Sequence, residues 1–249
     1  MLFRRPLTRT CRMPVTWVLV STLWLTGCAS SSTLSTTVRP DAGSAYTRLG
    51  VAYLEQNNLP RALNALDRAQ ELDANNPETL QALALVYQRQ GENALAAEYF
   101  QKALDADADF TRARNNYAAF LYQRGDYKSA CAQLETASKD AQYDHRAKLF
   151  TNLGQCYAAL DETQRARESL VRASKIDPRH ASSYFYLAKL ELSQGNNARA
   201  WPPLQRFFKL SRPTRDALEM AVTLARARGD NALAADYQQQ LARMNGTQP

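Results

Sequence analysis

The sequence predicts an all-α chain that folds as an α-solenoid of about six helix-turn-helix units. The first observation is a repeat: the same order of large and small apolar residues recurs in units that start at 43, 77, 111, 147, 181 and 215. These starts lie 34 residues apart, except for one spacing of 36. The second observation is that the apolar residues in each unit lie at helical spacing. The third is a glycine between the two halves of four units, where a turn with positive φ is expected. These glycines are Gly91, Gly125, Gly195 and Gly229.

The first half of each unit is predicted to be a helix with one apolar face. Tyr46, Leu49 and Tyr53 of the first unit lie three to four positions apart, so they share a face that is expected to pack. The small residue at Gly50 lets the second helix approach closely. Ala62, Ala96, Ala130 and Ala166 are expected to have the same role on the second helices. Because no single hairpin can bury its apolar face, the units must stack.

The repeat resembles the tetratricopeptide repeat, whose 34-residue pattern is W-x2-L-G-x2-Y, then A-x3-F, then P. The fourth unit matches it most clearly, with Phe150, Leu153, Gly154, Tyr157, Ala166, Leu170, Ala173 and Pro178. The resemblance covers residues 43–249, and the unit from 215 matches least, as a terminal capping unit would. In this class of repeat the first helices line the concave face.

The fifth unit contains an exception to the pattern. Trp201, Pro202 and Pro203 lie inside its expected second helix. Prolines lack a backbone donor and clash with the preceding turn, so this helix is expected to start late or to kink. Trp201 either fills the gap at the kink or anchors a partner.

Residues 1–27 are predicted to be a cleaved signal peptide, because four arginines precede a short apolar run from Val15 to Leu25. That run spans only about 16 Å as a helix, roughly half of a bilayer core. The sequence Leu25-Thr26-Gly27-Cys28 resembles the processing site of bacterial lipoproteins, and the alternative is an ordinary signal peptide with an incidental cysteine. The resemblance implies acylation of Cys28, transfer by the lipoprotein export machinery, and an outer-membrane location, since no Asp follows Cys28. Residues 28–42, rich in Ser and Thr, are predicted to be a flexible tether.

The charge balance does not indicate a nucleic-acid partner. The full chain has 31 Lys and Arg against 24 Asp and Glu, but the predicted signal peptide carries four of the arginines and none of the acids. The remaining chain has 27 Lys and Arg against 24 Asp and Glu, which is too small an excess of positive charge to indicate nucleic-acid binding.

Two cysteines, Cys131 and Cys156, remain after the signal peptide and Cys28 are set aside. Two readings stay open: a disulfide in an oxidising periplasm, or two small buried side chains that never meet. Cys131 lies in the second helix of the third unit and Cys156 in the first helix of the fourth, which are adjacent in a stack, so a bridge is geometrically plausible.

No catalytic, cofactor or metal site is expected, and neither is a small-molecule substrate. Motifs for zinc proteases, phosphate-binding loops and serine hydrolases are absent from the sequence. His145 and His180 fall at unit junctions and are predicted to be solvated. Asp105, Asp107 and Asp109 lack the glycine and the terminal Glu of a calcium loop, and are expected to solvate a turn.

The concave face is the candidate site for a protein partner. The residues predicted to form the partner groove are Thr47, Val51, Leu54, Gln81, Leu85, Gln88, Arg112, Asn115 and Tyr122. Lys148, Thr151, Gln155, Phe185 and Lys189 extend the same face into later units. The apolar strip at Val51, Leu54 and Leu85 suits an amphipathic helix or an extended apolar peptide, unless these residues pack inside the stack. Thr47, Val51 and Ala82 replace the basic and amide residues of the carboxylate clamp found in chaperone-binding relatives, so that clamp is not expected.

A lipoprotein cysteine, a short tether and six 34-residue units together resemble the type IV pilus biogenesis lipoproteins, the pilotins of the outer-membrane secretin. The segments ALALVYQRQGENALAAEYFQKAL and ARNNYAAFLYQRGDYKSA carry that resemblance. It implies a non-enzymatic protein that binds the secretin subunit, promotes its localisation and multimerisation in the outer membrane, and is required for twitching motility. The alternative is a lipoprotein scaffold of outer-membrane barrel assembly, or a regulator of peptidoglycan synthesis.

Overall fold

The computed structural model describes residues 39–246, with side chains described for 42–244. The predicted signal peptide, Cys28 and the tether up to residue 38 lie outside this range. Within it, the chain forms twelve helices and no strand. They are α1 (Arg39–Glu55), α2 (Leu59–Leu72), α3 (Pro77–Gln90), α4 (Asn93–Ala106), α5 (Thr111–Gln123), α6 (Tyr127–Ala137), α7 (Arg146–Ala159), α8 (Thr163–Ile176), α9 (Ala181–Ser193), α10 (Asn197–Leu210), α11 (Arg215–Ala227) and α12 (Asn231–Gly246).

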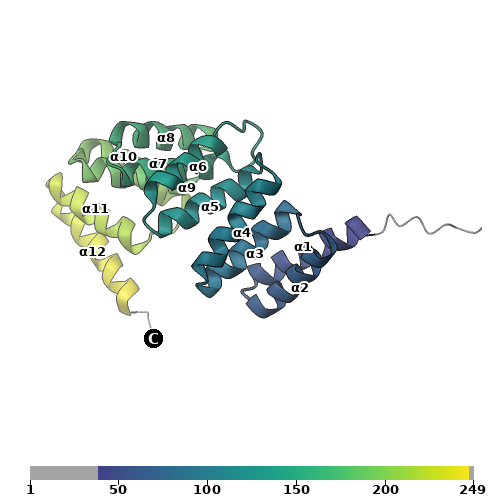
Figure 1. The fold of residues 1–249 in the computed structure, drawn as a ribbon. Coiled ribbons are helices and arrows are strands. Elements are labelled where there is room, and N and C mark those ends of the chain that lie inside the picture. The colour runs from purple at the N-terminus through teal and green to yellow at the C-terminus, as the bar shows by residue number, and fades with distance from the viewer. Residues whose placement is uncertain (1–38, 247–249) are drawn as a thin grey trace, which may run out of the picture. The chain divides into compact units, whose positions relative to one another are not determined.

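The predicted all-α solenoid is confirmed: six helical pairs follow one another along residues 39–246 (Figure 1). First helices α3, α5, α9 and α11 begin at the predicted unit starts, and α7 begins one residue early. Helix α1 begins at Arg39, four residues before the expected start of the first unit at 43. Its second residue is Pro40, and proline near a helix start costs no hydrogen bond.

The two kinds of helix contact different neighbours. Each second helix packs on its own first helix and on the first helix of the next unit. First helices also contact one another across units, from α1 with α3 to α9 with α11, whereas no two second helices within residues 39–246 are in contact. The first helices therefore form the inner side of the stack, and we call their solvent-facing side the inner surface.

The predicted glycine turns are confirmed. Gly91, Gly125, Gly195 and Gly229 have φ of 82°, 81°, 71° and 74°. In the first and fourth units, which lack this glycine, Asn57 and Asp161 take the position with φ of 57° and 59°. Asn and Asp are the side chains that tolerate this left-handed conformation best.

The close approach of the two helices at Gly50 is also confirmed. A Cβ atom on Gly50 would lie 2.5 Å from Cγ of Leu66, which is fully buried on α2. In the fourth unit, a Cβ on Gly154 would lie 2.5 Å from Cγ of Leu170. No side chain fits at these two points without displacing the facing leucine.

One packing prediction is wrong for the first unit. Tyr46 and Leu49 are 37% and 42% exposed, whereas Leu80 and Leu83, at the same positions of the second unit, are 2% and 0% exposed. Within the described residues, no helix precedes α1 to cover this face. The first unit has the same apolar positions as the second, but its face with Tyr46 and Leu49 lies at the open end of the described stack and stays exposed.

The predicted effect of Pro202 and Pro203 on the start of the fifth unit's second helix is wrong. Helix α10 begins at Asn197, two residues after Gly195, as α4, α6 and α12 do relative to their glycines. The prolines fall in its second turn, and the helix continues through them to Leu210. Trp201 is 8% exposed, with Arg228 5.0 Å from its ring and Tyr237 edge-on to it. Its burial favours the gap-filling role over the partner anchor.

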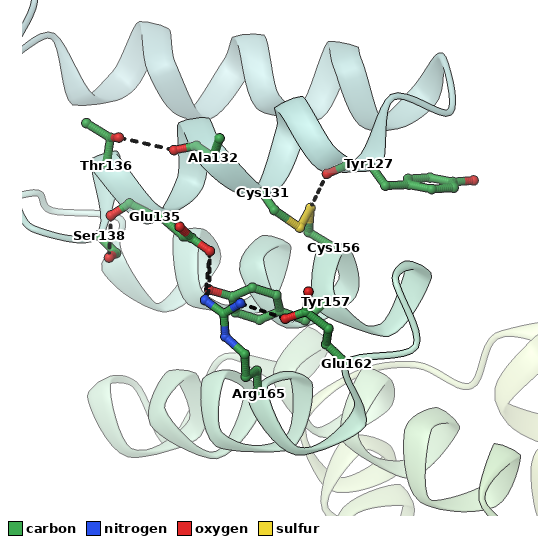
Figure 2. A network of polar contacts seen from close by, with 10 residues as sticks. All are labelled: Tyr127, Cys131, Ala132, Glu135, Thr136, Ser138, Cys156, Tyr157, Glu162 and Arg165. Carbon is green, nitrogen blue, oxygen red and sulfur yellow. Dashed lines mark hydrogen bonds and ion pairs between the residues drawn. A yellow bond between two sulfur atoms is a disulfide. The ribbon is translucent and has the colours of Figure 1, made fainter.

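Cys131 and Cys156 form a disulfide between α6 and α7, with a Cα–Cα distance of 5.6 Å (Figure 2). Below it, Arg165 of α8 lies over the ring of Tyr157 at 3.9 Å and donates hydrogen bonds to the Tyr157 hydroxyl and to Glu135. The Tyr157 hydroxyl itself donates to Glu135 at 2.9 Å. Burial, followed by the Glu135 carboxylate, raises the pKa of Tyr157 to about 12. This network joins three helices where the third unit is two residues longer than the others.

Candidate functional site

The inner surface contains two hollows at different places along the stack. The first, here called the early cavity, lies between the first and second units, with Arg112 of the third at its edge. It encloses about 400 Å³. Its lining residues are Thr47, Arg48, Val51, Ala52, Leu54, Glu55, Glu78, Gln81, Ala82, Leu85 and Arg112. Six of the nine predicted groove residues are therefore brought together here.

These six residues differ in how far a partner can reach them. Val51 is exposed, Leu85 is half-buried and Arg112 lies at the rim, where it forms an exposed ion pair with Glu78 at 3.1 Å. Thr47, Leu54 and Gln81 are buried, so their predicted role as contact residues is corrected.

The buried residues serve the packing of the first two units. The Thr47 hydroxyl donates to the carbonyl of Gly43 at 3.0 Å and lies 2.7 Å from the Thr79 hydroxyl. Leu54 packs in the core with Leu66 and Leu83. Because α1 and α3 contact one another, the residues of each that face the other helix are shielded from solvent.

Other predicted groove residues lie outside the early cavity. Asn115 is buried and accepts a hydrogen bond from the Asn152 amide at 3.0 Å, so it holds α5 to α7 rather than lining a groove. Gln88 donates to Gln123 at 2.9 Å across α3 and α5. Thr151 is buried too, and its hydroxyl is bonded to the carbonyl of Ala147.

The second hollow, here called the middle groove, follows α5, α7 and α9. It consists of two cavities of about 310 and 450 Å³ that share Tyr122, Gln155 and Tyr186. Burial is the main cause that raises the pKa of Tyr122 and of Tyr186, so both phenols are neutral hydrogen-bond donors at neutral pH. Lys189 lines the larger cavity. Small residues of α7, namely Gly154, Ala158 and Ala159, create the space.

Sequence reasoning found only part of the middle groove. Tyr122, Gln155 and Lys189 were expected on this face, but Tyr186 was not. Phe185 was expected instead, and it packs against Phe207 with ring centroids 5.4 Å apart. Neighbouring positions of a helix differ by 100° in direction, so an error of one residue exchanges a core residue for a surface residue.

The histidine prediction is half wrong. His145 is exposed, but the Nε2 atom of His180 is buried and has no hydrogen-bond partner within residues 42–244. Burial lowers the pKa of His180, Asp177 opposes this shift, and Lys148 adds to it. Asp105, Asp107 and Asp109 are all exposed, but Asp105 lies in the last turn of α4 and only the other two belong to the turn that follows, where Asp107 accepts the backbone N–H of Asp109 at 2.9 Å. In the described part of the chain, no cluster of His, Cys, Asp or Glu could hold a metal ion.

Comparisons with known proteins agree with this architecture. Tetratricopeptide repeat family models match residues 50–91, 87–153 and 151–207. The type IV pilus assembly protein PilF of Pseudomonas aeruginosa is 31% identical over 228 residues, which cover 88% of this chain and 89% of PilF. The chain belongs to the PilF family.

Solved structures extend this assignment. A P. aeruginosa PilF structure has a TM-score of 0.79 and 30% identity, over 84% of this chain and 95% of the solved one. The structure of PilW, described as a widely conserved type IV pilus biogenesis factor, has a TM-score of 0.76 at 23% identity, over 83% and 94% of the two chains. The PilF family likeness therefore spans the six units rather than a few repeats.

Family membership gives the inner surface its functional interest. A PilF-family chain with these repeats is a scaffold for protein–protein contacts, and repeat proteins offer extended concave surfaces to their partners.

No helix among residues 39–246 is long and apolar enough to cross a bilayer.

Proposed function

We propose that this chain is a pilotin: an outer-membrane lipoprotein, anchored at Cys28, that binds the type IV pilus secretin and promotes its localisation and multimerisation. The observation that carries the proposal is the similarity to a type IV pilus assembly protein over nearly the full length of both chains. The Leu-Thr-Gly-Cys sequence before residue 29 supports the lipid anchor.

The early cavity supports the choice of a protein partner. Its apolar residues Val51, Ala52 and Leu85 are flanked by charged rim residues of both signs, Arg48 and Arg112 against Glu55 and Glu78. An apolar strip of this kind accepts the apolar face of a helix or an extended segment. The balanced rim fixes the orientation of the segment rather than its affinity.

The mechanism that we propose combines this cavity with the anchor. The inner surface holds a secretin segment while the acyl chains on Cys28 direct the complex through the lipoprotein export route. Several acyl chains hold a protein firmly, because each buried methylene contributes about 0.8 kcal/mol. Tethered subunits meet at a high effective concentration in the plane of the membrane, and this favours ring formation.

The first experiment tests the anchor. A Cys28→Ser variant, expressed in place of the wild type, should fold normally and leave the secretin outside the outer-membrane fraction, with fewer heat-stable multimers. Fractionation and immunoblotting of the secretin give the readout. Normal placement and multimerisation of the secretin with this variant would contradict the proposal.

The second experiment tests the partner. Residues 29–249, immobilised and incubated with detergent-solubilised envelope, should enrich the secretin as identified by mass spectrometry. Val51→Glu should weaken this capture. Leu95→Glu is the matched control, because Leu95 is 37% exposed against 36% for Val51 but lies on second helix α4. Enrichment of barrel-assembly or wall-synthesis proteins without the secretin would support the alternative functions instead.

A further inference from the structure

The first unit has an apolar side that no other described element covers. Tyr46 and Leu49 of α1 are 37% and 42% exposed, and Leu72 of α2 is 36% exposed. The three share one side of the helical pair, because a Cβ on Gly43, one turn before Tyr46, would lie 3.7 Å from the Cβ of Leu72. We call these three residues and Arg68, one turn before Leu72, the open-end face. Helices α1 and α2 form this end of the stack in Figure 1.

The polar groups of the open-end face are paired with one another. Arg68 forms an exposed ion pair with Glu71. Glu71 is the main cause that raises the pKa of Arg68, and a hydrogen bond to the Tyr46 hydroxyl adds to this shift. With Glu71 included, the face carries no net charge, so a partner must be held there by apolar contact.

The two ends of the described stack differ in how they are capped. Repeat proteins need terminal units with a polar outer face, because an uncovered repeat exposes the apolar side that would pack on a neighbour. Among residues 215–244 of the sixth unit, only Met244 is a large apolar residue with comparable exposure. The first unit has three such residues on one side, so it lacks the polar cap that the last unit has.

The chain that leads to Cys28 indicates what covers the open-end face. Eleven residue steps separate Cys28 from Arg39, where α1 begins, and they span at most about 40 Å when fully extended. Acyl chains on Cys28 would therefore keep the first unit within that distance of the bilayer. Tyrosine and arginine suit such a place, because each combines an apolar body with a polar tip that stays among headgroups and water.

A second copy of the chain fits this face less well than a bilayer. Stable dimers bury about 800 Å² on each partner. Three side chains that are each 36–42% exposed offer only a fraction of that area. A tethered contact with the bilayer needs less area, because the anchor gives the face a high effective concentration at the membrane.

We propose that the open-end face rests on the lipid bilayer, with Leu49 and Leu72 at the boundary between headgroups and acyl chains. The Tyr46 hydroxyl and Arg68 then lie among the headgroups. Leu49 and Val51 are two positions apart in α1, so their side chains point about 200° apart around the helix. The early cavity therefore stays accessible to a protein partner. The inference deepens the proposed function, on which it rests for the acyl anchor at Cys28.

The test supplies the anchor chemically. Residues 28–249 have one thiol outside the Cys131–Cys156 disulfide, so Cys28 can be coupled to a maleimide lipid in vesicles of phosphatidylethanolamine and phosphatidylglycerol. Leu49→Trp in a Trp201→Phe background places a single tryptophan on the open-end face. Brominated acyl chains quench tryptophan that contacts the bilayer, and they should lower this emission at least twofold. Added salt should not reverse the quenching, because the contact is apolar.

Leu95→Trp in the same background is the matched control, because Leu95 is 37% exposed but lies on α4 of the second unit. Its emission should not change with brominated lipid. Addition of Leu72→Glu to the Leu49→Trp protein should reduce the quenching at least twofold, and addition of Leu95→Glu should not.

Three results would overturn the inference. The first is no quenching at position 49, or equal quenching at positions 49 and 95. The second is unchanged quenching after Leu72→Glu. The third is a blue shift of the tryptophan at position 49 that grows with protein density without quenching by the lipid, because a second copy would then cover the face.

The outcome is separable from that of the proposed function. The vesicles contain no secretin, and the chemical anchor does not depend on acylation in the cell. Absence of quenching would leave the Cys28→Ser and capture experiments unaffected. Normal placement of the secretin by Cys28→Ser would contradict the proposed function without changing the quenching of Leu49→Trp.

Discussion

Replacement of Gly50 by alanine tests whether close helix approach, rather than helix propensity, fixes this residue. In an exposed helix interior, Gly→Ala stabilises by about 1 kcal/mol, because alanine loses less conformational freedom on folding. At Gly50 the new Cβ would lie 2.5 Å from Cγ and 2.7 Å from Cδ2 of Leu66. Overpacking of this kind in a tight core costs about 1–3 kcal/mol. The two terms predict a net loss of up to about 2 kcal/mol in the free energy of unfolding.

The same helix provides the control. A Cβ on Gly43, two turns earlier in α1, would meet its nearest atom, Cβ of Leu72, at 3.7 Å, an ordinary contact distance. Gly43→Ala should therefore stabilise the protein, while Gly50→Ala destabilises it. Urea unfolding of residues 29–249, followed by circular dichroism at 222 nm, measures both. Hydrogen exchange of α1 shows whether the loss is confined to the first unit. A Gly50→Ala protein that is as stable as Gly43→Ala would refute the reasoning.

Three further predictions concern the joints between units. Reduction of the Cys131–Cys156 disulfide, which closes a loop of 25 residues, should lower the free energy of unfolding by about 3.5 kcal/mol, and an unchanged urea midpoint in dithiothreitol would contradict this. Burial alone would raise the pKa of Glu191, but hydrogen bonds from Arg167 and Asn196 outweigh it, so the folded-state pKa is lowered. The stabilisation from Glu191 is therefore present above its unfolded pKa of about 4.3 and is lost as the pH falls through the lower folded pKa. As the pH is lowered from 6 to 3, the urea midpoint should fall less steeply for Glu191→Gln than for the wild type. Equal falls for the two proteins would exclude a stabilising role of the Glu191 carboxylate. Trp201→Phe should leave capture of the partner unchanged because Trp201 is buried, and a loss of capture in a folded variant would restore its role as an anchor.

The repeat pattern predicted most of the fold because each pattern position has one physical task. Gly50 and Gly154 had to be small for the helices to approach, and the turn glycines had to reach positive φ. Asn57 and Asp161 at the same turn position carried a weaker signal, because both are also common in ordinary loops. The exposure of Tyr46 and Leu49 could not follow from the pattern, because the first unit has the same apolar positions as the second and the pattern does not say what precedes the first unit.

The site was less predictable than the fold. Whether an inner-surface residue is open or buried depends on how closely neighbouring first helices approach. The repeat does not specify this distance, so Thr47 and Asn115 were assigned to the groove although both are buried in contacts between helices. The middle groove depends on the absence of large side chains in α7 and on which tyrosines lack partners. Neither property is visible before the helices are placed side by side.

We propose that the inner surface of this PilF-family chain holds the secretin. Site-specific photocrosslinking tests it directly. A benzoylphenylalanine at Leu85, in the early cavity, should crosslink to the secretin subunit in intact envelopes. The same group at Leu95, which lies on second helix α4 and not on the inner surface, should not crosslink to the secretin. Equal crosslinking from both positions, or crosslinking to the secretin from Leu95 alone, would contradict the account.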